Sequence, residues 1–316
     1  MNNEINQKYE TFRERKQIGF ITFHPSYSYE EFVEGITFRA NKKEGEGDYH
    51  IKDGIFKKIC FRALYNIYQK NKESTAEISY EECKDIVMEN LEEIREIIKG
   101  GAEFDKFVLI IDEINRGDIS KIFGELITLL EDDKRVGKEN ELITTLPYSE
   151  EEFVIPPNLH IIGTMNTADR SIALIDIALR RRFGFEEMMP ILEDNGDTDC
   201  LYQVQKEKLS KEEFITFDIF RKQIIKLNEK ISILEEIGRD KQIGHSFLFK
   251  IKTGFVNENI SLIWNKEILP LLEEYCFQDR ETMQTVLSEV PGLKDITDHA
   301  HLKELFPNNV DESNNE

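Results

Sequence analysis

The sequence KFVLIIDEINR, residues 106–116, decides the fold, because it is an apolar run that ends abruptly in two carboxylates. Residues 107–111 are all apolar, which is typical of a strand covered on both faces, as in a parallel sheet. Asp112 and Glu113 would then lie at the carboxyl end of the strand, the edge where open α/β sheets bind ligands. There Asp112 can hold Mg²⁺ and Glu113 can orient a water molecule, as in a Walker B motif. The alternative is an ordinary strand followed by a polar loop, so the rest of the chain must decide.

The composition indicates a globular protein. The chain has 316 residues, 40% apolar and 10% aromatic, enough for one large domain or two ordinary ones. Its four cysteines form no C-x-x-C pair, so we expect buried reduced thiols rather than a zinc site or disulfides. No apolar segment is long enough to cross a bilayer, and the polar start lacks the core of a signal peptide. We therefore expect a cytoplasmic protein with no membrane partner.

The net charge of −21 argues against binding nucleic acid over the bulk of the surface, because such binding depends on Lys and Arg. Any contact with DNA would need a local basic patch or another subunit. Ordinary solubility is the simpler explanation of the acidity.

Predicted strands and helices alternate up to about residue 190, which indicates a parallel α/β sheet. The expected strands are residues 18–23, 107–111, 159–164 and 185–189, and the expected helices are residues 55–68, 74–101, a segment capped by Asp118, and 172–179. Residues 193–213 are acidic and polar and are predicted to link domain 1–192 to a helical domain, 214–306. In that domain we expect helices at 217–234 and 260–277, with a kink or restart at Pro270, before a disordered tail, 307–316.

Two further motifs suit a nucleotide site, although each has a simpler interpretation. Asn166 ends the strand at 159–164, where an amide can position water beside a terminal phosphate, but an Asn at a strand end is also a common turn residue. The run Arg180-Arg181-Arg182 could be a solvated helix end favoured by the helix dipole. In an oligomer, the same arginines could reach a neighbour's phosphate as arginine fingers.

Three segments together resemble the AAA+ motor subunit of modified-cytosine-dependent restriction systems, the McrB family. They are FHPSYSYEEFVEGI, IIDEINRGDISKIFGELITLLEDDKR and IIGTMNTADRSIALIDIALRRRFGF. The resemblance is close over about residues 18–190 and looser over 217–277. It implies an α/β nucleotide-binding domain of the AAA+ P-loop type, with a sheet sandwiched by helices, followed by a helical lid. It also implies assembly as a ring, commonly a hexamer, in which hydrolysis of GTP or ATP with Mg²⁺ drives movement on DNA. A separate nuclease subunit of the McrC type would cut the DNA.

Carried over to this sequence, the resemblance implies that Asp112 and Glu113 form Walker B and that Asn166 is sensor 1. Arg116 follows Walker B and would contact the adjacent subunit or nucleotide, with a surface salt bridge as the alternative.

The resemblance also gives roles to residues that would act on a neighbouring subunit. Asp169 and Arg170 of the MNTADRS segment would face the neighbour's nucleotide, and Arg181 or Arg182 would be the arginine finger.

The Walker A pattern G-x-x-x-x-G-K-[ST] does not occur in the 316 residues. Gly137-Lys138 is followed by Glu139, and Lys252-Thr253 is preceded by Ile251 rather than Gly. In the resembling family the P-loop and its strand lie upstream of the strand at 18–23, so we expect them to precede Met1. That strand would sit between the strands at 159–164 and 185–189, and without it both would carry unpaired backbone groups.

The leading hypothesis is therefore a fragment of a McrB-type motor, with its DNA-reading domain elsewhere. A second hypothesis is a non-catalytic module that donates Arg170, Arg181 and Arg182 in trans to an intact ring partner. A third is an AAA+ remodelling ATPase of the MoxR or dynein-like branch, which the MNTADRS segment makes a weaker match.

Overall fold

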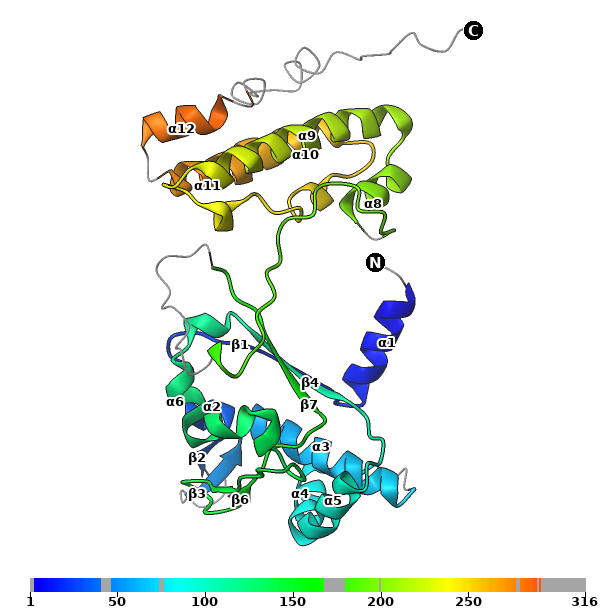
Figure 1. Ribbon diagram of the computed structural model, residues 1–316, viewed down its shortest axis with the longest axis vertical. Helices are drawn as coiled ribbons and strands as arrows, with labels where there is room; N and C mark the ends of the chain where they lie inside the picture. The colour runs from blue at the N-terminus through cyan, green and yellow to red at the C-terminus, as the bar shows by residue number, and fades with distance from the viewer. Residues whose placement is uncertain are drawn as a thin grey trace. The chain divides into compact units, whose positions relative to one another are not determined.

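The computed structural model describes residues 3–40, 47–73, 77–167, 180–198, 200–276, 279–288 and 290. The chain divides into two compact units (Figure 1). The boundary lies between Phe185 and Glu186.

The first unit is built on a parallel sheet of three strands in the order β1-β4-β7. These are β1 (Ile18–Thr22), β4 (Phe107–Asp112) and β7 (Leu159–Gly163). Ile21 pairs with Ile111 and Ile111 pairs with Gly163, so all three strands end at the same edge. The strands predicted from the three apolar runs are confirmed, and so is their parallel arrangement.

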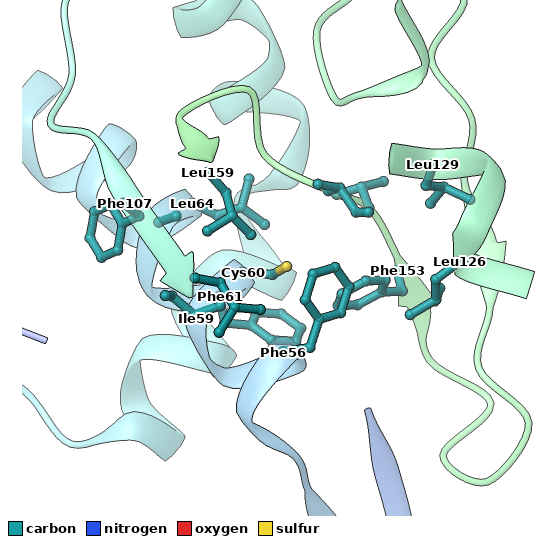
Figure 2. Close-up of a cluster of buried hydrophobic side chains, with 14 of the residues drawn as sticks. Phe56, Ile59, Cys60, Phe61, Leu64, Phe107, Leu126, Leu129, Phe153 and Leu159 are labelled. Atoms are coloured by element: carbon teal, nitrogen blue, oxygen red, sulfur yellow. The ribbon is translucent and has the colours of Figure 1, made fainter. Parts of the chain in front are cut away.

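Helix α3 (Ile55–Asn71) covers one face of this sheet. Its apolar side chains pack against β4 and β7 and against the segment that carries β6 (Glu152–Phe153), as Figure 2 shows. The residues labelled there are Phe56, Ile59, Cys60, Phe61 and Leu64 of α3 with Phe107, Leu126, Leu129, Phe153 and Leu159. The predicted amphipathic helix at 55–68 is therefore confirmed, and its apolar side chains form part of the core beneath the sheet.

The opposite face of the sheet is not covered to the same extent by the described residues, contrary to the expectation from the unbroken apolar run. Along β4, buried residues alternate with half-buried ones. Phe20 and Ile162, which flank Ile110 in the pairing register, are 59% and 51% exposed. An apolar run thus established the strand correctly, but it did not distinguish one covered face from two.

Short elements complete the first unit. They are α1 (Asn3–Glu14), α2 (Tyr29–Phe32), the hairpin β2 (Glu34–Ala40) and β3 (Gly47–Asp53), α4 (Tyr80–Glu89), α5 (Leu91–Lys99), α6 (Ile119–Phe123), the 3-10 turns Ile114–Arg116, Gly124–Leu130 and Asp132–Lys134, and the pair β5 (Thr144–Thr145) and β6. The helix predicted over 74–101 is two helices divided at Asn90. Asp118 caps α6 as expected, since its side chain accepts from the Lys121 amide at 3.2 Å.

Gly54 joins the hairpin to α3 at a very close approach of two backbones. A Cβ at this position would lie 2.3 Å from the carbonyl carbon and oxygen of Phe32. Because a backbone cannot yield as a flexible side chain does, we expect Gly54→Ala to lower the free energy of unfolding by about 1–3 kcal/mol. Thermal unfolding of Gly54→Ala beside Gly184→Ala, whose added Cβ meets nothing within 4 Å, checks this. Equal melting temperatures for the two variants would contradict it.

The second unit is helical. It contains α8 (Leu201–Lys208), α9 (Lys211–Ile233), α10 (Val256–Ile263), a π-turn (Trp264–Ile268), α11 (Leu269–Tyr275), α12 (Arg280–Leu287) and the 3-10 turns Arg239–Lys241 and Leu248–Lys250. Trp264 is fully buried in the apolar core of this unit. Pro270 lies in the first turn of α11, directly after the π-turn, so the predicted restart of the helix is confirmed.

Two predictions near the boundary between the units were wrong. Residues 185–189 form no strand, because no neighbouring strand among the described residues pairs with them, and Phe185 and Met188 are 50% and 82% exposed. The segment 193–213 is not an open linker, since it contains α8 and buries Leu201 and Leu209 in the core of the second unit. Because the segment is acidic and polar overall, its composition did not reveal that Leu201 and Leu209 pack into the second unit.

The four cysteines are free and buried, as predicted. Burial raises the pKa of the Cys83 thiol to about 12, which keeps it protonated and unreactive. In the part of the chain that is described, no helix has the length and apolar character needed to span a membrane. The predicted helix at 172–179 and the tail at 307–316 lie outside the described residues.

Candidate functional site

Asp112 is held at the carboxyl edge of the sheet by the neighbouring strand. The hydroxyl of Thr164, one residue beyond β7, donates to Asp112 Oδ1 at 2.6 Å. The oxygen of the same hydroxyl accepts from the Glu113 amide at 3.4 Å, and the Thr164 amide donates to the Ile111 carbonyl at 2.9 Å. The ends of β4 and β7 are therefore joined directly, and the carboxylate of Asp112 has a fixed direction.

Glu113 lies directly after the strand in a left-handed backbone conformation, with φ of 52°. A non-glycine residue seldom adopts this conformation, and such positions are concentrated at functional sites. The Ile114 amide donates to the Thr164 carbonyl at 2.9 Å, which fixes the turn to the end of β7. The Glu113 side chain is only 27% exposed and forms an ion pair with Arg116 at 3.1 Å. Arg116 therefore makes a salt bridge within the site.

Asn166 follows β7 and is exposed. Its backbone carbonyl accepts from the Asn115 side chain at 3.3 Å, so the turn after β4 and the segment after β7 meet a second time. The structure thus brings Asp112, Glu113 and Asn166 to one edge of one sheet, as the sequence predicted.

The three arginines of the run at 180–182 have different surroundings. Arg182 forms an ion pair with Glu131 at 2.9 Å, and its side chain is only 16% exposed. Arg180 lies over the Phe185 ring, with 5.8 Å from the guanidinium carbon to the ring centroid. Arg181 is exposed. Of the two predicted arginine fingers, Arg181 is thus the more accessible, whereas Arg182 is held by a carboxylate of its own unit.

Sequence reasoning missed Thr164 and Asn115, which join the two strand ends. A hydroxyl residue at the end of a strand beside a Walker B strand was the available signal for Thr164. Asp169 and Arg170 lie outside the described residues.

The donors at this edge suit Mg²⁺, which prefers oxygen ligands and is commonly held by one or two carboxylates together with substrate phosphates. Asp112 offers such an oxygen, and the Thr164 hydroxyl fixes its orientation. Among the described residues, no group of three or more His, Cys, Asp or Glu side chains is placed to hold a metal ion. Asp112 could thus contribute one oxygen ligand to such a cation.

Comparison with known families agrees with this arrangement. The family described as AAA domain (dynein-related subfamily) matches residues 4–183, and the family described as McrB, alpha-helical lid domain, matches residues 220–284. The chain belongs to the McrB-type AAA+ proteins. Its fold is accordingly an α/β AAA domain followed by a helical lid.

Two curated relatives come from restriction systems. The chain is 34% identical over 281 residues to the type IV methyl-directed restriction enzyme EcoKMcrB subunit of Escherichia coli K12, a match that covers 88% of this chain and 51% of the relative. It is 33% identical over 93 residues to the type II restriction enzyme BsuMI component YdiS of Bacillus subtilis 168, covering 26% of this chain and 27% of the relative. The chain thus spans about half of the first relative and about a quarter of the second.

Proposed function

We propose that this protein is a nucleoside-triphosphatase subunit of a DNA restriction system. The observation that carries the proposal is the hydrogen bond from Thr164 to Asp112, which joins the Walker B strand to the strand bearing Asn166. The restriction-system relatives support the biological setting.

In the proposed reaction, Asp112 would hold the Mg²⁺ that accompanies the nucleotide, and the cation would supply neutralisation of the phosphate charge. Glu113 accepts a proton from the attacking water. The water oxygen bonds to the terminal phosphorus while the bond from that phosphorus to the bridging oxygen breaks, and the nucleoside diphosphate leaves. Asn166 orients the same water through its amide. Arg181 of a neighbouring subunit stabilises the charge of the transition state, with Arg182, Arg170 and Asp169 as further contributors from that subunit.

The Walker A pattern does not occur within the 316 residues, so the proposed reaction takes its phosphate cradle from another segment or subunit. The proposal includes assembly as a ring, use of GTP or ATP, and a nuclease partner of the McrC type. The second candidate, donation of arginines in trans by a non-catalytic subunit, is favoured by the exposure of Arg181. Mixing this chain with a partner that has a Walker A motif but mutated fingers tests donation in trans, because only such donation restores hydrolysis. Glu113→Gln in this chain then discriminates between the candidates, since it lowers the restored rate if this chain also catalyses and leaves it unchanged if this chain only donates arginines.

Asp112→Asn tests the proposed metal role in the protein assembled with its Walker A motif. We expect loss of hydrolysis by a factor of about 10² or more, together with a higher Mg²⁺ requirement, because the amide lacks the charge that binds the cation. Hydrolysis is measured as phosphate release across a Mg²⁺ titration. Glu139→Gln, at an exposed acid outside the site, is the matched control. An Asp112→Asn variant with wild-type rates and Mg²⁺ dependence would refute the role.

A further inference from the structure

A cavity of about 460 Å³ in the first unit gathers basic side chains in an otherwise acidic protein. Its lining includes Arg13, Lys16, Lys52, Lys58 and Arg62, which come from the end of α1 and the residues after it, from β3 and from α3. We propose that this basic pocket binds the phosphates of a nucleic-acid backbone. The proposal rests on the proposed function only in taking DNA as the partner.

The charges of the basic pocket are available to a ligand. Arg13 pairs with Glu10 at 2.7 Å, but both side chains are largely exposed, so the pair is weak. For Lys16, Lys52, Lys58 and Arg62, the described residues supply no carboxylate within ion-pair distance. Positive charges that are not neutralised locally attract an anion from solution.

The acids that line the same pocket are already engaged. Asp53 forms ion pairs with Lys57 at 2.9 Å and Lys84 at 3.1 Å, and it accepts from the Tyr80 hydroxyl at 2.7 Å. Glu31 accepts from the Ser28 amide at 3.3 Å as part of the cap of α2. The pocket therefore presents a net positive charge.

Two further features suit a nucleic acid. Gly54 and Ile55 place the N-terminus of α3 in the pocket, and Gly54 offers no side chain to cap it, so the positive end of the helix dipole adds to the basic side chains. Phe20, 59% exposed, also lines the pocket and offers a ring on which a base can stack.

The distribution of these groups favours a backbone over a single phosphate ion. The basic side chains come from three parts of the chain, and there are more of them than one phosphate can contact. A single phosphate would also make no use of the exposed ring of Phe20. A nucleic acid presents repeated phosphates beside bases and uses both.

The test is fluorescence anisotropy with labelled single-stranded and double-stranded oligonucleotides, without nucleotide triphosphate, over a range of salt. We expect Lys58→Gln/Arg62→Gln to raise Kd about tenfold and to reduce the slope of log K against log salt by about 1.5–2, since two phosphate contacts are lost. Lys138→Gln, at an exposed lysine outside the pocket, is expected to leave both unchanged. Lys16→Gln/Lys52→Gln is a second variant that spares the Tyr80 contacts of Lys58 and Arg62.

Absence of wild-type binding at low salt, or equal losses in the pocket variants and Lys138→Gln, would overturn the proposal. Displacement of DNA by inorganic phosphate at equal concentration would indicate a site for free phosphate, and tighter binding of an acidic peptide would indicate a protein partner; either result overturns it. Hydrolysis without DNA binding would contradict the proposal for the basic pocket but not the proposed function. DNA binding without hydrolysis would contradict the proposed function but not the proposal for the pocket.

Discussion

Replacement of Glu113 by glutamine is expected to abolish nucleotide hydrolysis while leaving nucleotide binding intact. The substitution preserves the size of the side chain and an oxygen that can accept from Arg116, so the turn after β4 should keep its structure. It removes the group that takes the proton from water, and loss of a general base lowers rates by about 10²- to 10⁴-fold. Phosphate release and binding of a fluorescent nucleotide measure the two effects separately.

This variant differs from Asp112→Asn, which should also raise the Mg²⁺ requirement. Glu139→Gln again serves as the control for loss of an acidic charge in the same unit. Undiminished hydrolysis in Glu113→Gln would show that another group activates the water. Loss of both binding and hydrolysis would show that Glu113 maintains the structure of the site.

The sheet and the edge that carries the site could be predicted because the signals are local. An apolar run followed by Asp112 and Glu113 specifies a buried strand with acids at its end, and the same logic places Asn166 after β7. If the two strands pair in parallel, the end of β4 and the end of β7 must lie together, so this prediction needs no long-range contact to be known. The hydrogen bond from Thr164 to Asp112 could not be predicted this way, because it depends on the register between residues 52 positions apart in the sequence.

Predictions failed where a segment depends on its neighbours. Residues 185–189 have the composition of a strand, but a strand forms only when another pairs with it. The sequence predicts a linker where α8 forms, because Leu201 and Leu209 stand among many polar residues, although both are buried. The distinction between Arg181 and Arg182 likewise depends on Glu131, which is distant in the sequence.

Lys57 also depends on residues that are distant in the sequence. The helical pattern places it on the polar face of its helix, but in the structure it is fully buried. Its ammonium contacts Glu34 at 2.6 Å, Asp53 at 2.9 Å and Glu151 at 2.6 Å, which ties α3 to the hairpin and to the segment before β6. Burial opposes the charge, yet the hydrogen bonds that the ammonium donates to these carboxylates outweigh it and raise the pKa of Lys57 to about 12.

Lys57→Met is therefore expected to lower the free energy of unfolding by about 3–5 kcal/mol at neutral pH, because buried carboxylates lose their partner. Lys70→Met in the same helix is the matched control: its pair with Asp105 is exposed, and its loss should cost about 0–1 kcal/mol. Denaturant unfolding of both variants measures the difference. Equal losses would show that the buried cation contributes no more than a surface one.

The pH dependence sharpens this test. Burial alone would raise the pKa values of Glu34 and Asp53, but their hydrogen bonds and the charge of Lys57 outweigh it and lower them below 4.5 and 3.8. The contributions of Glu34 and Asp53 to the free energy of unfolding are thus present above these values and are lost as the pH falls through the folded-state pKa. The contribution of Lys57 is complete below pH 10.5 and is lost as the pH rises through about 12. The loss of unfolding free energy in Lys57→Met should consequently be largest between about pH 4.5 and 10.5. It should shrink in acid, where protonation removes the unpaired negative charges of Glu34 and Asp53. A deficit that stays constant from about pH 7 to about pH 3 would indicate lost packing rather than lost charge pairing.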